Sequence, residues 1–137
     1  MPDLVVLDTH VWIWLLNGDA ISDVAKATIR KAADQGAIRV PAISVWEVGM
    51  LVAKGRLMLR MPCRDWVRSA LAAPGIHLAE FSPEVALESC QLPGGIHGDP
   101  ADRMIAATAR ILEATLVTRD EKLLAYSRAG HLLAVPA

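Results

Sequence analysis

Two kinds of hydrophobic pattern alternate along the chain. Short, mostly apolar runs, typical of strands buried on both faces of a sheet, are separated by longer stretches with the period of an amphipathic helix. Strands that alternate with helices predict an α/β fold, in which a central parallel sheet of about four or five strands is covered by helices on both faces. The predicted strands span residues 4–7, 38–43, 77–81, 115–118 and 132–135.

The predicted helices have recognisable ends. Gly55 closes one of them, Pro74 and Gly75 close the next, and Ser82 followed by Pro83 is typical of a helix start. The helices are predicted over residues 11–16, 22–35, 45–54, 64–73, 100–113 and 121–128, with a further one that begins at Ser82.

The helix over residues 100–113 has the clearest pattern. Met104, Ile105, Ile111 and Leu112 share one stripe, and the small Thr108 falls between them. The sequence therefore predicts that this stripe is the apolar face of the helix.

Length and composition limit the alternatives. The 137 residues suit a single domain, residues 1–137, with one core. Apolar residues make up 53% of the chain, which is high for a soluble domain and indicates that a partner covers some apolar surface. No apolar run approaches the ~20 residues of a membrane span. The chain begins Met1, Pro2, Asp3, without the basic start of a signal peptide, so we expect a cytoplasmic protein.

Charge and cysteine content argue against two further classes of protein. The net charge of -1 does not suit a protein that grips nucleic acid by bulk positive charge. Cys63 and Cys90 lack the spacing of a zinc or redox motif, so we expect free thiols in the core.

Acidic residues stand where the predicted strands and helices meet. Asp8, Glu47 and Asp120 follow strands, and Asp102 opens the helix over residues 100–113. Such helix starts converge at the carboxyl edge of a parallel sheet, where these folds place their sites. Because carboxylates gathered at one edge repel one another unless a cation joins them, a divalent metal site is the leading interpretation.

Helix capping is the competing explanation for each acid. Asp8, Asp99 and Asp120 precede predicted helices, and Ser44 with Glu47 has the spacing of a capping box. A cap and a metal ligand are compatible, because a carboxylate offers about four acceptor positions. Capping alone, however, gives no reason for several acids to gather at one edge of the sheet.

The chemistry of a carboxylate cluster is specific. Hard oxygen ligands favour Mg²⁺ or Mn²⁺ over zinc. A cation held in this way activates a coordinated water and stabilises charge on a phosphoryl oxygen, without a nucleophilic side chain. The cluster therefore favours hydrolysis of a phosphodiester.

Four segments of the chain also carry a family resemblance. VVLDTHVWIWLL, ISVWEVGMLVAKGRL, HGDPADRMIAATA and LVTRDEKL, in that order, resemble the motifs of PIN-domain ribonucleases. Within that family they are most similar to the VapC-like toxins of type II toxin-antitoxin pairs, and the resemblance extends from Asp8 to Leu123. It implies a PIN-like three-layer fold, an endoribonuclease that depends on Mg²⁺ or Mn²⁺, a homodimer, and a cognate antitoxin whose tail covers the active site.

The resemblance also implies roles for individual residues. Three aspartates position the cation, and Glu47 binds or orients the attacking water. Asp99 is a neighbouring acid in the third motif, and Thr118 stands where the family commonly has a small hydroxyl residue near the site. The catalytic quartet that the resemblance implies is Asp8, Glu47, Asp102 and Asp120.

Basic and aromatic residues adjoin this quartet. Arg103 and Arg119 are predicted to contact substrate phosphate or the antitoxin, although solvated surface charge is the plainer explanation. His10 lies beside the site, but a single histidine without a second ligand is more typical of packing or of the surface.

On a helix, Trp12 and Trp14 point about 200° apart. One of them is therefore a candidate for a dimer or antitoxin surface, unless both sides of the helix are covered within the monomer.

Two other functions are compatible with parts of the pattern. Asp8 follows the first strand, as the nucleophile of an aspartyl phosphatase does, but this chain has no second aspartate two positions later. A receiver-type phosphoacceptor module is a related possibility, but the lysine that such a module has after its last strand is absent here. A catalytically silent module that binds a protein partner is the remaining alternative. The intact quartet argues against it, because such a module has no need of four mutually repelling carboxylates.

Overall fold

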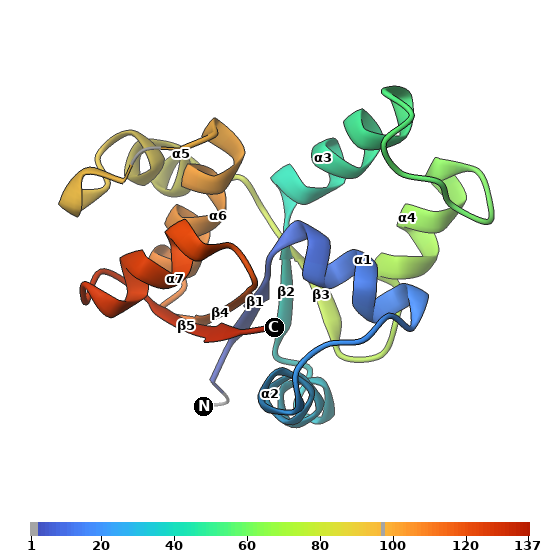
Figure 1. The fold of residues 1–137 in the computed structure, drawn as a ribbon, viewed down its shortest axis with the longest axis horizontal. Helices are drawn as coiled ribbons and strands as arrows, with labels where there is room; N and C mark the ends of the chain where they lie inside the picture. The colour runs from blue at the N-terminus through green and yellow to red at the C-terminus, as the bar shows by residue number, and fades with distance from the viewer. Residues whose placement is uncertain (1–2, 97) are drawn as a thin grey trace.

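The strands form one five-stranded sheet in the order β3-β2-β1-β4-β5, and every neighbouring pair is parallel (Figure 1). The computed structural model describes residues 3–96 and 98–137, so Met1, Pro2 and His97 lie outside the described residues. The observed sheet confirms the predicted fold class. Its strands are β1 (Val5–Leu7), β2 (Ile38–Pro41), β3 (Ile76–Ala79), β4 (Thr115–Thr118) and β5 (Leu133–Pro136).

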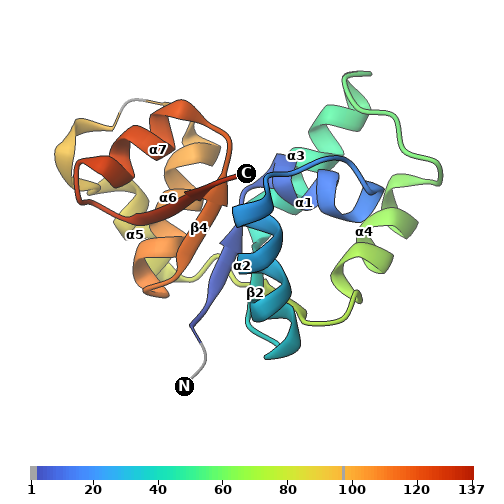
Figure 2. The same cartoon turned by 60° about the horizontal axis from the view of Figure 1, so that its bottom comes forward.

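Helices cover both faces of the sheet. In Figure 2, α5, α6 and α7 lie on one side of the molecule and α1 to α4 on the other. A short 3-10 turn, Pro93–Gly95, lies in the loop before α6. The α-helices of the described residues are α1 (Thr9–Asn17), α2 (Asp23–Asp34), α3 (Ala42–Ala53), α4 (Cys63–Leu71), α5 (Pro83–Cys90), α6 (Pro100–Ile111) and α7 (Glu121–Arg128).

The core has two parts because successive strand residues point to opposite faces. Val5 and Leu7 of β1 belong to the cluster under α1, α2 and α4, whereas Val6 between them belongs to the cluster under α5, α6 and α7. Leu116 and Val117 of β4 divide in the same way. A strand buried on both faces reads as a continuous apolar run, which is why these strands were predictable.

Three local predictions are wrong. Cys90 is exposed and Cys63 is only partly buried, so the free thiols do not lie in the core. The capping box at Ser44 and Glu47 does not exist, because α3 begins at Ala42 and its N-cap is Pro41, without a side-chain hydrogen bond. Ser44 is instead buried within the helix.

The expected apolar stripe of α6 is also different. Ile105 and Thr108 are buried, but Ile111 is exposed. Four of the six buried residues of this helix are alanines, Ala101, Ala106, Ala107 and Ala109. Small side chains let this helix lie close to β1, β4 and α5. The prediction was wrong because it placed the large apolar residues, rather than the alanines, on the buried face.

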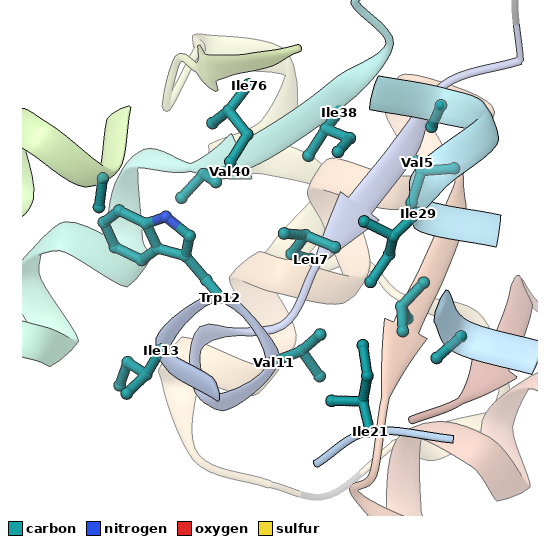
Figure 3. Packing of buried hydrophobic residues seen from close by; sticks show 14 of the residues in the cluster. Val5, Leu7, Val11, Trp12, Ile13, Ile21, Ile29, Ile38, Val40 and Ile76 are labelled. Carbon is teal, nitrogen blue, oxygen red and sulfur yellow. The ribbon is translucent and has the colours of Figure 1, made fainter. Parts of the chain in front are cut away.

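The two tryptophans of α1 have different environments. Trp12 is fully buried, reaches from α1 toward Val40 (Figure 3), and meets Trp66 edge to face at a centroid distance of 5.0 Å. Trp14 is half-buried. Across residues 3–96 and 98–137, no helix has both the length and the apolar character needed to cross a membrane.

Candidate active site

The candidate site lies at the point where the order in which strands are added to the sheet reverses, between β1 and β4. From β1 the chain adds β2 and β3 on one side, and it later returns to place β4 on the other side of β1. The backbone N–H of Asp8, just past β1, donates to Val117 O of β4 at 3.0 Å, so the ends of these two strands are joined. Crevices at such switch points are the usual ligand sites of open α/β sheets.

A pocket of about 420 Å³ opens at this point. All four residues of the predicted quartet line it, although they come from four different segments of the chain, and Asp99 joins them. The expected gathering of acids at one edge is therefore observed. The lining residues are Asp8, His10, Trp14, Glu47, Asp99, Asp102, Arg119 and Asp120.

Three of these aspartates are also helix caps. Asp8 Oδ1 accepts from Thr9 N at 2.8 Å, Asp99 Oδ1 accepts from Ala101 N at 2.8 Å, and Asp120 Oδ1 accepts from Lys122 N at 2.8 Å. In each case the cap uses one carboxylate oxygen. Capping and a pocket role thus occur together, because the cap orients the carboxylate and leaves its second oxygen for other partners.

Thr118 links two of the acids. Its fully buried hydroxyl donates to Asp8 Oδ2 at 2.6 Å and accepts from Asp120 N at 3.0 Å. The hydroxyl therefore fixes the Asp8 carboxylate and the start of α7 at the same time. Thr118 was expected near the site from the family resemblance, and the structure places it behind the carboxylates.

Thr9 and Ser44 orient Glu47 and were missed in the sequence. The Thr9 hydroxyl lies 2.5 Å from Glu47 Oε1 and 2.8 Å from Ser44 Oγ, and both hydroxyl residues are buried. The available signals were a threonine next to Asp8 and a serine one helical turn before Glu47. The spacing of Ser44 and Glu47 alone suggests a cap. The contact of Ser44 with Thr9 cannot be seen in that spacing, because it joins residues that are 35 positions apart.

Burial keeps two of the carboxylic acids easier to protonate than usual. Desolvation raises the pKa of Asp8, against the opposing effect of its hydrogen bonds from Thr118 and Thr9. Desolvation likewise raises the pKa of Glu47, and the hydrogen bond from Thr9 opposes it. Both acids are thus held in surroundings that disfavour an uncompensated negative charge.

Asp102 is the most perturbed acid. Burial, followed by the negative charges of Asp120, Asp8, Asp99 and Glu47, raises its pKa to about 7. All of these effects raise the pKa, so a nearby positive charge would favour the ionised carboxyl.

Ion pairs do not relieve this repulsion. Within residues 3–96 and 98–137, the salt bridges are Arg110 with Glu88 and Arg128 with Glu121, and neither pair involves the pocket. The charge of His10 opposes the rise in the pKa of Asp8 and Glu47, but burial outweighs it, so further positive charge is needed to balance the five acids of the pocket.

The donor set fits a hard divalent cation. Carboxylate oxygens are the preferred ligands of Mg²⁺ and Mn²⁺. No three acidic, histidine or cysteine side chains among the described residues already converge on one metal position. Mg²⁺ does not need such a cage, because it commonly keeps several waters and binds through one or two carboxylates and substrate phosphate.

Arg103 has a structural role that the sequence did not predict. Its Nε donates to Ser89 O at 3.0 Å and its Nη1 donates to Ile96 O at 2.6 Å, and it does not line the pocket. Its donors are thus used to hold the loop that leads into α6. Arg103 therefore positions the segment that carries Asp99 and Asp102, and its contact with substrate or the antitoxin stays a prediction.

Arg119 does line the pocket. Its guanidinium carbon lies 4.0 Å from the centroid of the Trp14 ring, and Nε and Nη2 donate to Ala137 O and Ala20 O, each at 3.2 Å. The side chain is exposed, and it is the only arginine or lysine among the described residues that line this pocket. Its predicted contact with substrate remains a prediction that this position allows.

We expect Thr118→Val to lower the free energy of unfolding by about 1–3 kcal/mol, because it leaves a buried Asp8 oxygen and the Asp120 N–H without a partner. Urea unfolding measures the change. Thr28→Val is the matched control, since Thr28 Oγ1 donates only to a carbonyl of its own helix. Equal losses in the two variants would contradict a special role for the buried hydroxyl.

Comparison with known proteins assigns the chain to a family. The model of the PIN domain matches residues 5–129. The chain is 34% identical over 120 residues to Ribonuclease VapC22 of Mycobacterium tuberculosis (strain ATCC 25618 / H37Rv), which covers 87% of this chain and 88% of that protein.

Solved structures share the fold. The crystal structure of VapBC2 from Rickettsia felis bound to a promoter DNA fragment aligns with a TM-score of 0.72 and 19% identity, over 97% of this chain and 98% of that one. DNA-bound VapBC from Salmonella typhimurium aligns with a TM-score of 0.70 and 14% identity, over 98% of both chains. Because the family model matches from β1 through α7 and the relative is 34% identical over 87% of the chain, the chain belongs to the PIN domain family.

Proposed function

We propose that this protein is a metal-dependent endoribonuclease that hydrolyses RNA phosphodiester bonds and acts as the toxin of a toxin-antitoxin pair. The observation that carries the proposal is the pocket lined by five carboxylates without an ion-pair partner among the described residues. The similarity to Ribonuclease VapC22 supports RNA as the substrate.

In this proposal, Asp8, Asp102 and Asp120 hold Mg²⁺ or Mn²⁺. When bound, the cation polarises a phosphoryl oxygen and lowers the pKa of a coordinated water. The raised pKa of Asp102 matches a group that needs a nearby positive charge to ionise fully near neutral pH. The Thr118 hydroxyl is hydrogen-bonded to both the Asp8 carboxylate and the backbone N–H of Asp120, so it fixes two of the three proposed ligands relative to each other.

Glu47 orients the attacking water and accepts its proton. Its pKa is raised by burial, which makes the carboxylate a better base than a solvated glutamate. The hydrogen bond from Thr9 fixes Oε1, and Oε2 is left for the water. Arg119, which lines the same pocket next to Asp120, contacts a phosphate of the RNA.

The proposed partners are a cognate antitoxin and a second copy of this chain. VapBC complexes are among the similar structures, which supports an antitoxin. Large exposed apolar side chains, including Trp46 at 59% and Met58 at 92% exposure, are available for protein contacts. We infer a cytoplasmic location from the proposed RNA substrate.

Cleavage of cellular RNA tests the proposed function. Protein freed of antitoxin is incubated with a mixed RNA pool in Mg²⁺, in Mn²⁺ and in EDTA. Discrete fragments that appear only with metal support a nuclease and reveal its target. RNA that stays intact under all three conditions would instead favour a protein-binding module.

We expect metal to stabilise the protein more at pH 8 than at pH 5. The folded-state pKa of Asp102 is about 7, compared with 3.8 in an unfolded chain, so the contribution of Asp102 to the stability of the metal-free protein is most favourable below about pH 4 and is lost as the pH rises toward 7. The cation binds the ionised carboxylates and reverses the loss. At 100 times its dissociation constant, metal adds about 2.7 kcal/mol, or roughly 10 °C in melting temperature.

Melting curves with and without Mn²⁺ at the two pH values measure this difference. An equal Mn²⁺ shift at pH 5 and pH 8 would show that the raised pKa of Asp102 is not linked to metal binding.

A further inference from the structure

One wall of the acidic pocket consists of planar side chains. Trp14 lies at its centre, with the guanidinium carbon of Arg119 at 4.0 Å from the ring centroid. The imidazole of His10 is tilted by 46° to the indole, at a centroid distance of 5.9 Å. The three side chains line the same pocket as the carboxylates. We call this group, His10, Trp14 and Arg119, the planar wall.

The planar wall is fixed to the residues of the proposed active site. Trp14 and His10 lie on α1, the helix that Asp8 caps, and Trp14 packs partly against the core. Arg119 directly precedes Asp120 and is held by the carbonyls of Ala20 and Ala137. A ligand on this wall would therefore sit at a set position relative to the carboxylates.

The positive side chains of the wall form no ion pair with the acids among the described residues, although the charge of His10 opposes the rise in the pKa of Asp8 and Glu47. The guanidinium of Arg119 stacks on Trp14 instead. Arginine planes and aromatic rings in this arrangement are the surfaces on which proteins stack unpaired bases.

We infer that the planar wall stacks a nucleobase of single-stranded RNA beside the phosphate that enters the acidic pocket. This inference rests on the proposed function, because it adds a base-binding surface to the same site. A base that stacks on protein has left the stack of its own helix, so the site takes unpaired nucleotides. Since every base has a π-face, the wall binds without hydrogen-bond readout of sequence.

RNA oligonucleotides with one base removed test this contact directly. The sequence around a cleaved bond is synthesised intact and with a stable abasic residue at each flanking position, and kcat/KM is measured for each. For the wild type we expect about tenfold slower cleavage when one particular base is missing, in line with the effect of losing one stacked base. The ratio of intact to abasic rates does not depend on how much of the protein is active.

The variants are chosen to separate stacking from folding. Trp14→Leu is expected to bring that ratio close to one, and Trp14→Phe is expected to keep most of it because the ring is retained. Trp46→Leu is the control, since Trp46 is an exposed tryptophan on α3 that does not line the pocket. It is expected to keep the wild-type ratio.

Three results would overturn the inference in different ways. If Trp14→Leu slows cleavage of intact and abasic RNA equally, Trp14 only supports the structure. If Trp14→Leu keeps full RNA cleavage but loses the antitoxin, the wall is a protein-binding surface. If the wild type cleaves no RNA with metal, the proposed function itself fails, and the stacking inference fails with it.

Discussion

Asp8→Asn is expected to reduce metal-dependent RNA cleavage by about a hundredfold or more, because it removes one negative ligand from the proposed cation site and a metal supplies several kcal/mol of transition-state stabilisation. The amide keeps an oxygen for the cap to Thr9 N, so the start of α1 is preserved. Cleavage rates in Mn²⁺, measured with the RNA that the wild type cuts, give the effect.

Stability provides the internal check on this variant. Asp8 is buried in a cluster of like charge, and burial raises its pKa. Removing its charge relieves the repulsion, but the amide nitrogen that replaces Oδ2 no longer accepts from Thr118, so we expect the melting temperature of the metal-free protein to change little. Asp34→Asn is the control, because Asp34 is exposed at the end of α2 and outside the pocket. Cleavage by Asp8→Asn at the rate of the control would show that the acids serve only as caps.

Trp12→Ala is expected to have the largest effect on stability, a loss of about 3 kcal/mol. A fully buried tryptophan replaced by alanine usually costs about 3–5 kcal/mol, because transfer free energy is lost and a cavity remains. The low end applies here, since Trp12 Nε1 is buried without a hydrogen-bond partner among the described residues and its removal relieves that cost. The contact with the ring of Trp66 is lost as well.

Trp46→Ala is the matched control for this loss. Trp46 is 59% exposed, and surface substitutions usually change stability by less than about 0.5 kcal/mol. Chemical unfolding of both variants gives the comparison. A loss below 1 kcal/mol for Trp12→Ala would mean that α1 repacks readily, and the site residues Asp8 and Thr9 at its start would then be less firmly held than the structure indicates.

Much of the fold could be predicted because its signals are local. Strand β1 is an apolar run and β4 has an apolar centre, since both of their faces are buried, and α7 is preceded by an aspartate that is a good cap. The position of Asp8, Glu47, Asp102 and Asp120 at one sheet edge also follows from chain order, because helices that leave or enter parallel strands start at the same edge.

The supporting residues could not be predicted in the same way. Thr9 meets Glu47 from 38 positions away, and Thr118 meets Asp8 from 110 positions away. Arg103 adjoins Asp102 in sequence, yet its side chain holds a loop rather than facing the pocket. Neighbours in sequence on a helix point in different directions, so adjacency to a quartet residue was a poor guide.

The sequence by itself determined the alternation of strands and helices, the edge at which the acids gather, and the family resemblance, because each depends on local pattern and chain order. Only the tertiary structure decided which hydroxyls orient the carboxylates and that Trp12 is buried while Trp14 borders the pocket with Arg119. Those outcomes depend on contacts between segments far apart in the chain, which form only when the sheet is assembled and helices pack on both of its faces.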